Sequence, residues 1–122
     1  MAKTIMTVDD SPSMRKMICL ALQGAGYQCV EAQDGLDGLK KAQAVKCDAI
    51  IADQNMPNMD GITFVREIKK TARYASTPII MLSSDSRADL KQMAREAGAL
   101  GWMVKPFDQA TLIAAVRKVV GA

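Results

Sequence analysis

Residues 49–61 read Ala-Ile-Ile-Ala-Asp-Gln-Asn-Met-Pro-Asn-Met-Asp-Gly and join a strand, a loop and the start of a helix. Ala49–Ala52 is a short apolar run, typical of a buried strand, and it ends at the carboxylate of Asp53. Asp60 is a residue type that caps helices. Beyond it, apolar residues recur at helical spacing, namely Ile62, Val65 and Ile68. The stretch therefore predicts a strand–loop–helix unit.

The same unit recurs along the whole chain. Short runs that favour strands occur at Thr4–Val8, Gln28–Ala32, Ala49–Ala52, Pro78–Leu82 and Leu100–Val104. Apolar residues at helical spacing follow each of them. Strict alternation of strands and helices predicts a parallel sheet covered by helices on both faces. Because crossover connections are right-handed, we expect an α/β fold with a doubly wound five-stranded sheet.

Helix boundaries agree with this alternation. We expect N-caps at Ser11, Asp60, Ser86 and Asp108. Glycines mark the expected helix ends, at Gly24 or Gly26, Gly98 and Gly121. No linker, repeat or low-complexity segment interrupts the pattern, so we expect a single domain over residues 1–122.

Composition excludes several function classes. The 122 residues are 49% hydrophobic and 24% charged, as in globular proteins. The net charge of +3 and the 4% aromatic content argue against nucleic acid as a partner. The chain has no histidine, which excludes Ser-His-Asp and Cys-His catalysis, histidine-containing zinc sites and a phosphohistidine carrier.

Cysteine usage and the chain start predict the compartment. Cys19, Cys29 and Cys47 are odd in number and form no Cys-x-x-Cys pair, so we expect reduced, buried thiols rather than a disulfide framework. The first residues become charged too soon for a signal peptide. No apolar run approaches the roughly 20 residues that span a bilayer. We therefore expect a cytoplasmic protein without membrane contact, and a monomer.

Polar residues follow the predicted strands and define a candidate site. Parallel strands bring their carboxyl ends to one edge of the sheet, where ligands bind. The residues expected there are Asp9, Asp10, Asp53, Gln54, Asn55, Ser83, Ser84 and Lys105. Three carboxylates held this close repel one another, and a site built this way is suited to a cation. Oxygen ligands without His or Cys favour Mg²⁺ or Mn²⁺ over zinc.

This set of residues suits phosphoryl transfer. A carboxylate can act as nucleophile and form an aspartyl-phosphate, and Asp53 is favoured because the central buried strand ends there. Lys105 and Ser83 would supply a cation and a hydroxyl donor for the phosphoryl oxygens. Asp9 and Asp10 are better placed as metal ligands. Taken singly, these residues also fit a helix-entry turn or an ordinary loop, so the prediction depends on their combination.

These motifs resemble the receiver domain of bacterial two-component response regulators, and within that family the stand-alone chemotaxis type. The resemblance covers essentially the whole chain. Its motifs are Thr4–Ser11, Asp53–Gly61, Met81–Ser83 and Lys105–Phe107. It implies a flavodoxin-like (βα)₅ receiver fold with strand order 2-1-3-4-5.

The resemblance also implies a role for each site residue. Asp53 would accept the phosphoryl group. Mg²⁺ would bind the carboxylates of Asp10 and Asp53 and the backbone carbonyl of Asn55, with Asp9 acting largely through a water molecule. Ser83 would be the switch hydroxyl, and Lys105, with a cis bond to Pro106, would pair with the phosphoryl group.

Further residues are implied to tune the switch. Trp102 occupies the position of the aromatic switch residue, where similar proteins usually carry Tyr or Phe. Ser83 replaces the commoner Thr and lacks its methyl group, which predicts a looser switch. Asn55 and Asp85 occupy positions expected to set the lifetime of the phosphoryl group by orienting water. Ser84, beside Ser83, is a further candidate for tuning.

The implied function is a phosphorylation-driven switch that promotes only its own phosphorylation and dephosphorylation, and is not otherwise an enzyme. A histidine kinase or a small acyl phosphate would be the donor. The flagellar motor switch would be the output partner, and a phosphatase a further partner. A phosphate sink, a phosphorelay shuttle or a regulator of a non-flagellar partner fits the same residues.

Two functions of other classes fit less well. An Asp-dependent phosphatase would place a second acid where Asn55 stands, and would carry a cap over its substrate. A flavin-binding electron carrier would need a phosphate cradle in the first loop, where the acidic pair Asp9-Asp10 stands instead.

Overall fold

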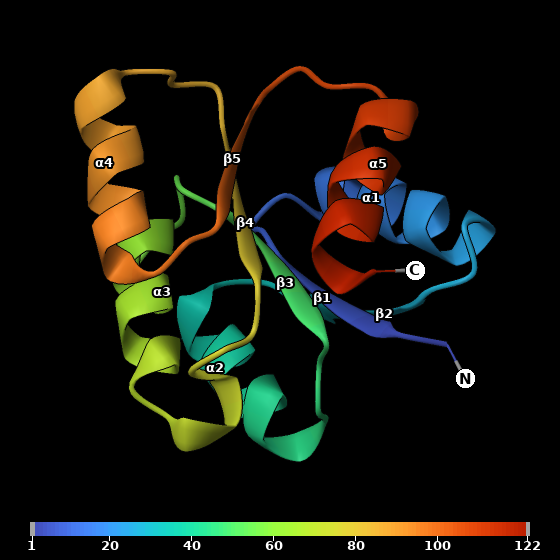
Figure 1. Ribbon diagram of the computed structural model, residues 1–122, viewed down its shortest axis with the longest axis horizontal. Coiled ribbons are helices and arrows are strands. Elements are labelled where there is room, and N and C mark those ends of the chain that lie inside the picture. The colour runs from blue at the N-terminus through green and yellow to red at the C-terminus, as the bar shows by residue number, and fades with distance from the viewer. Residues whose placement is uncertain (1, 122) are drawn as a thin grey trace.

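A computed structural model describes residues 2–121 of the chain. Strands and helices alternate along this part of the chain (Figure 1). The strands are β1 (Thr4–Val8), β2 (Gln28–Ala32), β3 (Ala49–Asp53), β4 (Ile79–Ser83) and β5 (Gly101–Val104). The helices are α1 (Pro12–Gly24), α2 (Gly35–Ala44), α3 (Gly61–Lys69), α4 (Ala88–Ala97) and α5 (Gln109–Val120), with a 3₁₀ turn, η1 (Ala72–Tyr74). Among the helices described, none has both the length and the apolar character needed to cross a membrane.

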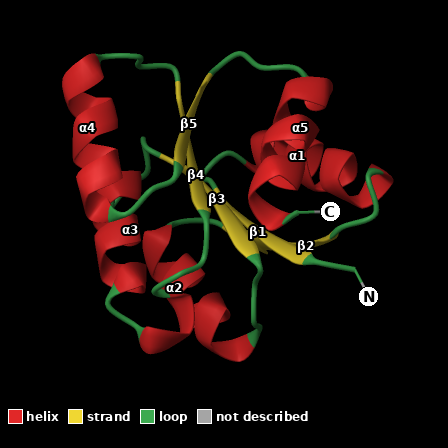
Figure 2. Cartoon of the chain, viewed as in Figure 1, coloured by secondary structure: helices red, strands yellow, loops and turns green. Residues whose placement is uncertain are grey.

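The strands form one parallel sheet in the order β2-β1-β3-β4-β5, which confirms the predicted fold class and strand order. Helices α1 and α5 cover one face, and α2, α3 and α4 cover the other (Figures 1 and 2). This arrangement makes β3 the central strand, and every one of its residues is buried. The chain therefore places Asp53 at the carboxyl end of the best-shielded strand.

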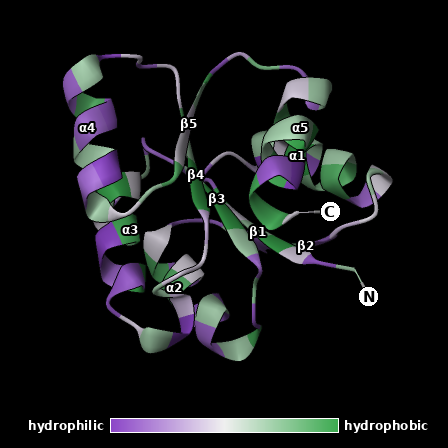
Figure 3. Cartoon of the chain, viewed as in Figure 1, coloured by the Kyte–Doolittle hydropathy of each residue, from purple (hydrophilic) through white to green (hydrophobic). Residues whose placement is uncertain are grey.

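Apolar side chains on the two faces of the sheet build two cores. Along β3, Ile50 packs into the core under α2, α3 and α4, whereas Ile51 packs under α1 and α5. This alternation follows from the two-residue period of a strand. The strands are accordingly mostly apolar, while α4 carries much of its hydrophilic character on its outer side (Figure 3). Burial on both faces explains why the inner strands β3 and β4 read as apolar runs, whereas the edge strand β2 carries polar, exposed residues.

The predicted strand bounds differ from the observed ones by at most one residue. Strands β3 and β4 continue to Asp53 and Ser83, whose polar side chains made the runs look shorter. Pro78 precedes β4 because it has no N–H to give to the ladder. Its carbonyl still accepts a hydrogen bond from the Ile50 N–H at 3.0 Å.

Side chains cap most of the helices. The predicted N-caps Ser11, Asp60 and Asp108 are confirmed, since each accepts a hydrogen bond from a first-turn N–H. The prediction of Ser86 is wrong: Arg87 is the N-cap of α4 and makes no side-chain cap bond. The side chain of Asp85 instead accepts the Arg87 N–H at 3.0 Å, which moves the helix start by one residue. The Asp34 cap of α2 was not predicted.

The prediction of three reduced cysteines is wrong for two of them. Cys19 in α1 and Cys29 in β2 form a disulfide, with their Cα atoms 5.5 Å apart. Cys47 is a free, buried thiol, as expected. A count of cysteines does not reveal this pairing because it depends on how α1 packs on β2. The cross-link ties the first helix to an edge strand of the sheet.

Candidate functional site

The carboxyl ends of four strands converge at the predicted edge. Asp9 and Asp10 follow β1, while Asp53 and Ser83 are the last residues of β3 and β4, and Lys105 follows β5. One carboxylate oxygen from each of the three aspartates lies within 4.8 Å of the others. The predicted acidic cluster is thus brought together.

A lysine holds the two buried carboxylates of the cluster. The Lys105 ammonium donates a hydrogen bond to Asp53 Oδ1 at 3.0 Å and lies 3.7 Å from Asp9 Oδ2. Burial raises the pKa of the Asp53 carboxyl group, the bond from Lys105 opposes that rise, and the neighbouring charge of Asp9 adds to it. One ammonium therefore does not fully compensate the negative charge gathered here.

Asp9 is fixed by its backbone neighbours. Its Oδ1 atom accepts a hydrogen bond from the Ser11 N–H at 2.9 Å, which ties the carboxylate to the start of α1. Its backbone carbonyl accepts a bond from the Arg15 guanidinium at 2.6 Å. Arg15 also pairs with Glu31 of β2 at 3.2 Å. Arg15 was not among the predicted site residues, although a basic residue in the first turns of the helix after an acidic pair could have indicated a contact with that pair.

The donor set fits a hard divalent cation. Asp9 Oδ2 is buried and has no hydrogen-bond partner among the described residues. Asp10 is exposed, as is Asn55 in the loop after β3, so the cluster opens to solvent on one side. Carboxylate oxygens with an open side suit Mg²⁺, which keeps several of its water molecules. The acidic cluster can therefore bind Mg²⁺.

The loop after Asp53 is held against the start of α3. Gln54 is buried, and its side-chain oxygen accepts a hydrogen bond from the Ile62 N–H at 2.9 Å. Its backbone carbonyl accepts one from the Gly61 N–H at 3.0 Å. A Cβ atom on Gly61 would lie 2.5 Å from the Asp53 carbonyl oxygen, so only glycine allows this approach. The sequence alone predicted no structural role for either Gly61 or the Gln54 side chain.

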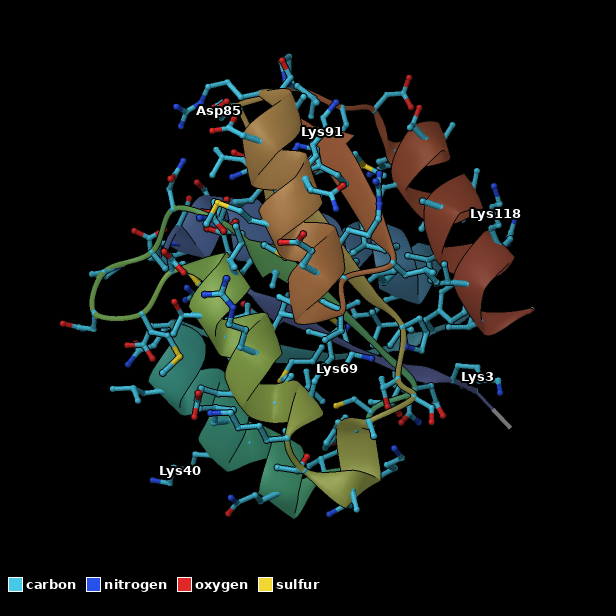
Figure 4. All side chains as sticks on the ribbon, turned by 60° about the vertical axis from the view of Figure 1, so that its left-hand side comes forward. Lys3, Lys40, Lys69, Asp85, Lys91 and Lys118 are labelled. Carbon is cyan, nitrogen blue, oxygen red and sulfur yellow. A yellow bond between two sulfur atoms is a disulfide. The ribbon has the colours of Figure 1, made fainter. Side chains whose placement is uncertain are left out.

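A chain of hydrogen bonds links Ser83 to Trp102. The buried Ser83 hydroxyl accepts a bond from the Asp85 N–H at 3.0 Å. The Asp85 carbonyl accepts one from the Trp102 indole N–H at 3.1 Å. Asp85 lies in the loop that leads into α4 (Figure 4). Trp102, which is partly buried on β5, is thus connected to the Ser83 hydroxyl through a single residue.

The Asp85 carboxylate faces its own loop. It forms a salt bridge with the Arg87 guanidinium at 2.9 Å, and hydrogen bonds from Arg87 lower the pKa of Asp85. Ser84, beside it, is exposed. A water-orienting role for Asp85 would therefore compete with Arg87.

The loop after β5 holds Lys105 in place. The Lys105–Pro106 peptide bond is cis, as the resemblance implies. The Lys105 N–H donates to the Ser83 carbonyl at 2.8 Å. The lysine is therefore anchored through its backbone to Ser83, the last residue of β4.

Comparison with known families identifies this arrangement. The model of the response regulator receiver domain matches residues 5–117 of the chain. The chain belongs to this family. Receiver domains are phosphoacceptor signalling domains that interact with histidine kinases, and they are not enzymes of the usual kind.

Individual relatives show how far the likeness extends. The chemotaxis protein CheY4 of Vibrio cholerae has a solved structure with a TM-score of 0.95 and 41% identity, covering 98% of this chain and 99% of that one. The receiver domain of the sensor histidine kinase PA1611 of Pseudomonas aeruginosa has a TM-score of 0.90 and 27% identity over all of both chains. That structure contains a magnesium ion in its active site cleft.

The curated relatives are longer proteins. The phosphate regulon transcriptional regulatory protein PhoB of Pseudomonas aeruginosa is 37% identical over 122 residues, which cover 97% of this chain and 52% of PhoB. This receiver domain thus spans about half the length of the curated relatives it matches.

Proposed function

We propose that this receiver domain is a switch driven by phosphorylation of Asp53, with a histidine kinase or a small acyl phosphate as the donor. The main support for this proposal is the position of Asp53. It is buried at the end of the central strand, its Oδ1 atom lies 3.0 Å from the Lys105 ammonium, and Asp9 and Asp10 stand beside it. A carboxylate attacks phosphorus well when nearby cations offset the charge of the incoming group.

The acidic cluster would hold the metal ion this chemistry requires. Asp10, Asp53 and the Asn55 carbonyl are the proposed ligands of Mg²⁺, with Asp9 acting largely through water. Mg²⁺ bound there would neutralise charge on the phosphoryl oxygens. Lys105 then has the complementary task, because its ammonium can move from the Asp53 carboxylate to a phosphoryl oxygen without leaving the site.

The response of the domain begins at Ser83. The Ser83 hydroxyl accepts the Asp85 N–H and keeps its own O–H free to donate, and we infer that it moves toward a phosphoryl oxygen and lengthens its bond from Asp85. This change would release the loop before α4, whose Asp85 carbonyl holds the Trp102 indole. We infer that Trp102 follows, and that phosphorylation remodels the face formed by α4, β5 and α5 as a population shift between two states.

We propose the flagellar motor switch as the partner of this face, in a cytoplasmic chemotaxis pathway. The likeness to the chemotaxis protein CheY4 over nearly the whole of both chains supports this destination. The likeness to PhoB, a transcriptional regulator, supports the alternative of a non-flagellar partner with the same Asp53 chemistry. A phosphate sink or a phosphorelay shuttle would also use this chemistry without a motor.

The chemistry is tested with acetyl phosphate and Mg²⁺. Intact-mass spectrometry should show one added phosphoryl group on the wild type and none on Asp53→Asn, and chelation of Mg²⁺ should abolish the addition. Asp60→Asn is the matched control, because Asn can keep the N-cap of α3 and Asp60 lies outside the acidic cluster. Labelling of Asp53→Asn at the wild-type rate would refute Asp53 as the acceptor.

The proposed output partner is tested by calorimetry with an N-terminal peptide of a flagellar switch protein. Beryllofluoride serves as the mimic of the phosphoryl group, and a change in Trp102 emission reports that it has bound. Binding that tightens about tenfold with the mimic, equivalent to about 1.4 kcal/mol, supports the motor partner. Occupancy of the site without peptide binding would favour a sink, a shuttle or a non-flagellar partner.

A further inference from the structure

A salt bridge and a disulfide both join α1 to β2, and they lie next to each other along the seam where the helix packs on the strand. Arg15 pairs with Glu31 at 3.2 Å, and Cys19 is bonded to Cys29. Cys19 lies four residues after Arg15, a rise of about 6 Å along a helix. Cys29 lies two residues before Glu31, a step of about 6.6 Å along a strand, and on the same face of it. The matched steps place the salt bridge and the disulfide side by side, one helical turn apart.

The two bonded cysteine residues differ in exposure. Cys29 is partly buried and lies on β2, which is an edge strand and has no neighbour on its outer side. Cys19 is only 6% exposed and belongs to the buried side of α1. An approaching thiolate therefore reaches Cys29 more readily than Cys19. The third cysteine, Cys47, is fully buried in the core on the other face of the sheet and offers an internal control.

The contacts of α1 do not depend on the disulfide. Ile18 and Leu22 are fully buried in the core between α1, α5 and the sheet. The Arg15–Glu31 pair spans the same seam without sulfur. The Ser11 cap holds the start of the helix. These contacts persist when the disulfide opens, so both the dithiol and the disulfide form are expected to be folded.

We propose that Cys19 and Cys29 form a reversible thiol–disulfide exchange site for low-molecular-weight thiols. In reduction, an external thiolate attacks the Cys29 sulfur, forms a mixed disulfide with it and displaces Cys19 as a thiolate. A second external thiolate then attacks the external sulfur of this mixed disulfide, which releases the small disulfide and the Cys29 thiolate. Oxidation by a small disulfide is the reverse, so two electrons pass between the pair and two molecules of thiol.

Opening this bond acts on the helix that follows the acidic pair. Arg15, one turn from Cys19, donates to the Asp9 carbonyl, so the seam connects the cysteine pair to the start of the site loop. The disulfide closes a loop with a sequence separation of 10, which restricts the unfolded chain. The oxidised form should therefore melt about 10 °C above the reduced form and slow amide exchange in α1.

The test equilibrates the native chain in glutathione buffers from fully reduced to fully oxidised. Free thiols are then trapped with an alkylating reagent and counted by intact mass, with peptide mapping. We expect Cys19 and Cys29 to convert together, so that species with both or neither labelled dominate, while Cys47 stays unlabelled. Cys47→Ser should leave this transition unchanged. Cys19→Ser should instead accumulate a mixed disulfide of Cys29 with glutathione.

Two results would overturn the proposal. A bond that resists reduced glutathione in the folded chain, and opens only in denaturant, would be a structural cross-link. A reduced chain that loses its circular dichroism signal would show that the dithiol form does not fold. The phosphorylation assay on Asp53 is read separately, so failure of the exchange site and failure of the proposed switch are distinguishable.

Discussion

At the scale of single residues, the negative charge of Asp53 destabilises the folded domain. It is 4% exposed, with the Asp9 and Asp10 carboxylates close by and one lysine as its direct cationic partner in the described chain. We predict that Asp53→Asn raises the free energy of unfolding at neutral pH, without Mg²⁺, by about 1 kcal/mol. Thermal unfolding in a chelating buffer measures this change.

The pH dependence of this effect has a definite sign. Because the pKa of Asp53 is raised in the folded state, the folded chain binds the proton more readily than the unfolded chain does. The wild type therefore loses stability relative to Asp53→Asn as pH rises through that raised pKa. Below the ordinary Asp range the two should converge. Asp89→Asn, at an exposed position of α4 outside the acidic cluster, is the control for the loss of one negative charge.

At the scale of elements, Gly61 sets how closely α3 approaches the acceptor strand. A Cβ atom there would lie 2.5 Å from both the Asp53 carbonyl oxygen and the Met81 methyl carbon. We predict that Gly61→Ala destabilises the domain by about 2–4 kcal/mol and displaces the start of α3. Gly24→Ala, at the end of α1 with nothing within 4 Å, should instead be neutral or stabilise by up to about 1 kcal/mol. Equal denaturation midpoints for the two variants would contradict this account.

A buried tyrosine joins elements at the opposite edge of the sheet. The Tyr74 hydroxyl lies 2.7 Å from the Ala42 carbonyl oxygen and accepts a bond from the Cys47 N–H at 3.2 Å. We predict that Tyr74→Phe costs about 1–3 kcal/mol in chemical denaturation, because buried backbone groups lose their partner. Tyr27→Phe is the matched control, since the buried Tyr27 hydroxyl has no partner among residues 2–121. A similar loss in both variants would show that lost packing, not hydrogen bonding, is responsible.

Sequence predicts the elements well here for a physical reason. The inner strands β1, β3 and β4 are buried along nearly their whole length, so each apolar run ends where the polar site begins. The same rule predicted the convergence of the aspartates with Ser83 and Lys105, because parallel strands share one carboxyl edge. The starts of α1 and α5 were predictable because a side chain supplies the cap, at Ser11 and Asp108.

Contacts that depend on the packing of one element on another were not predictable. The Cys19–Cys29 bond needs the register of α1 on β2, and no local pattern encodes it. The pairing of Arg87 with Asp85 was not predictable either, because the sequence offers the Arg87 side chain several possible partners. Such contacts adjust the site, whereas the strand order establishes it.

At the scale of the whole molecule, the acidic cluster lies where the ends of β1 and β3 meet and Lys105 joins them to β5. Neutralising its charge should therefore stabilise the domain as a unit. Unfolding the chain separates Asp53 from the adjacent pair Asp9-Asp10, so a cation that needs both groups binds the folded state alone. Global unfolding then reports occupancy of the site.

We therefore predict that Mg²⁺ raises the unfolding free energy of the wild type by about 1.4 kcal/mol for each tenfold increase above its dissociation constant, as one-site binding requires. Chelation should reverse the gain. Asp10→Asn should shift the onset to higher Mg²⁺ concentration, because it removes one carboxylate of the cluster. Asp37→Asn, an acidic residue of α2 paired with Lys41, should follow the wild-type curve. The same curve for wild type and Asp10→Asn would mean that Mg²⁺ acts elsewhere on the surface.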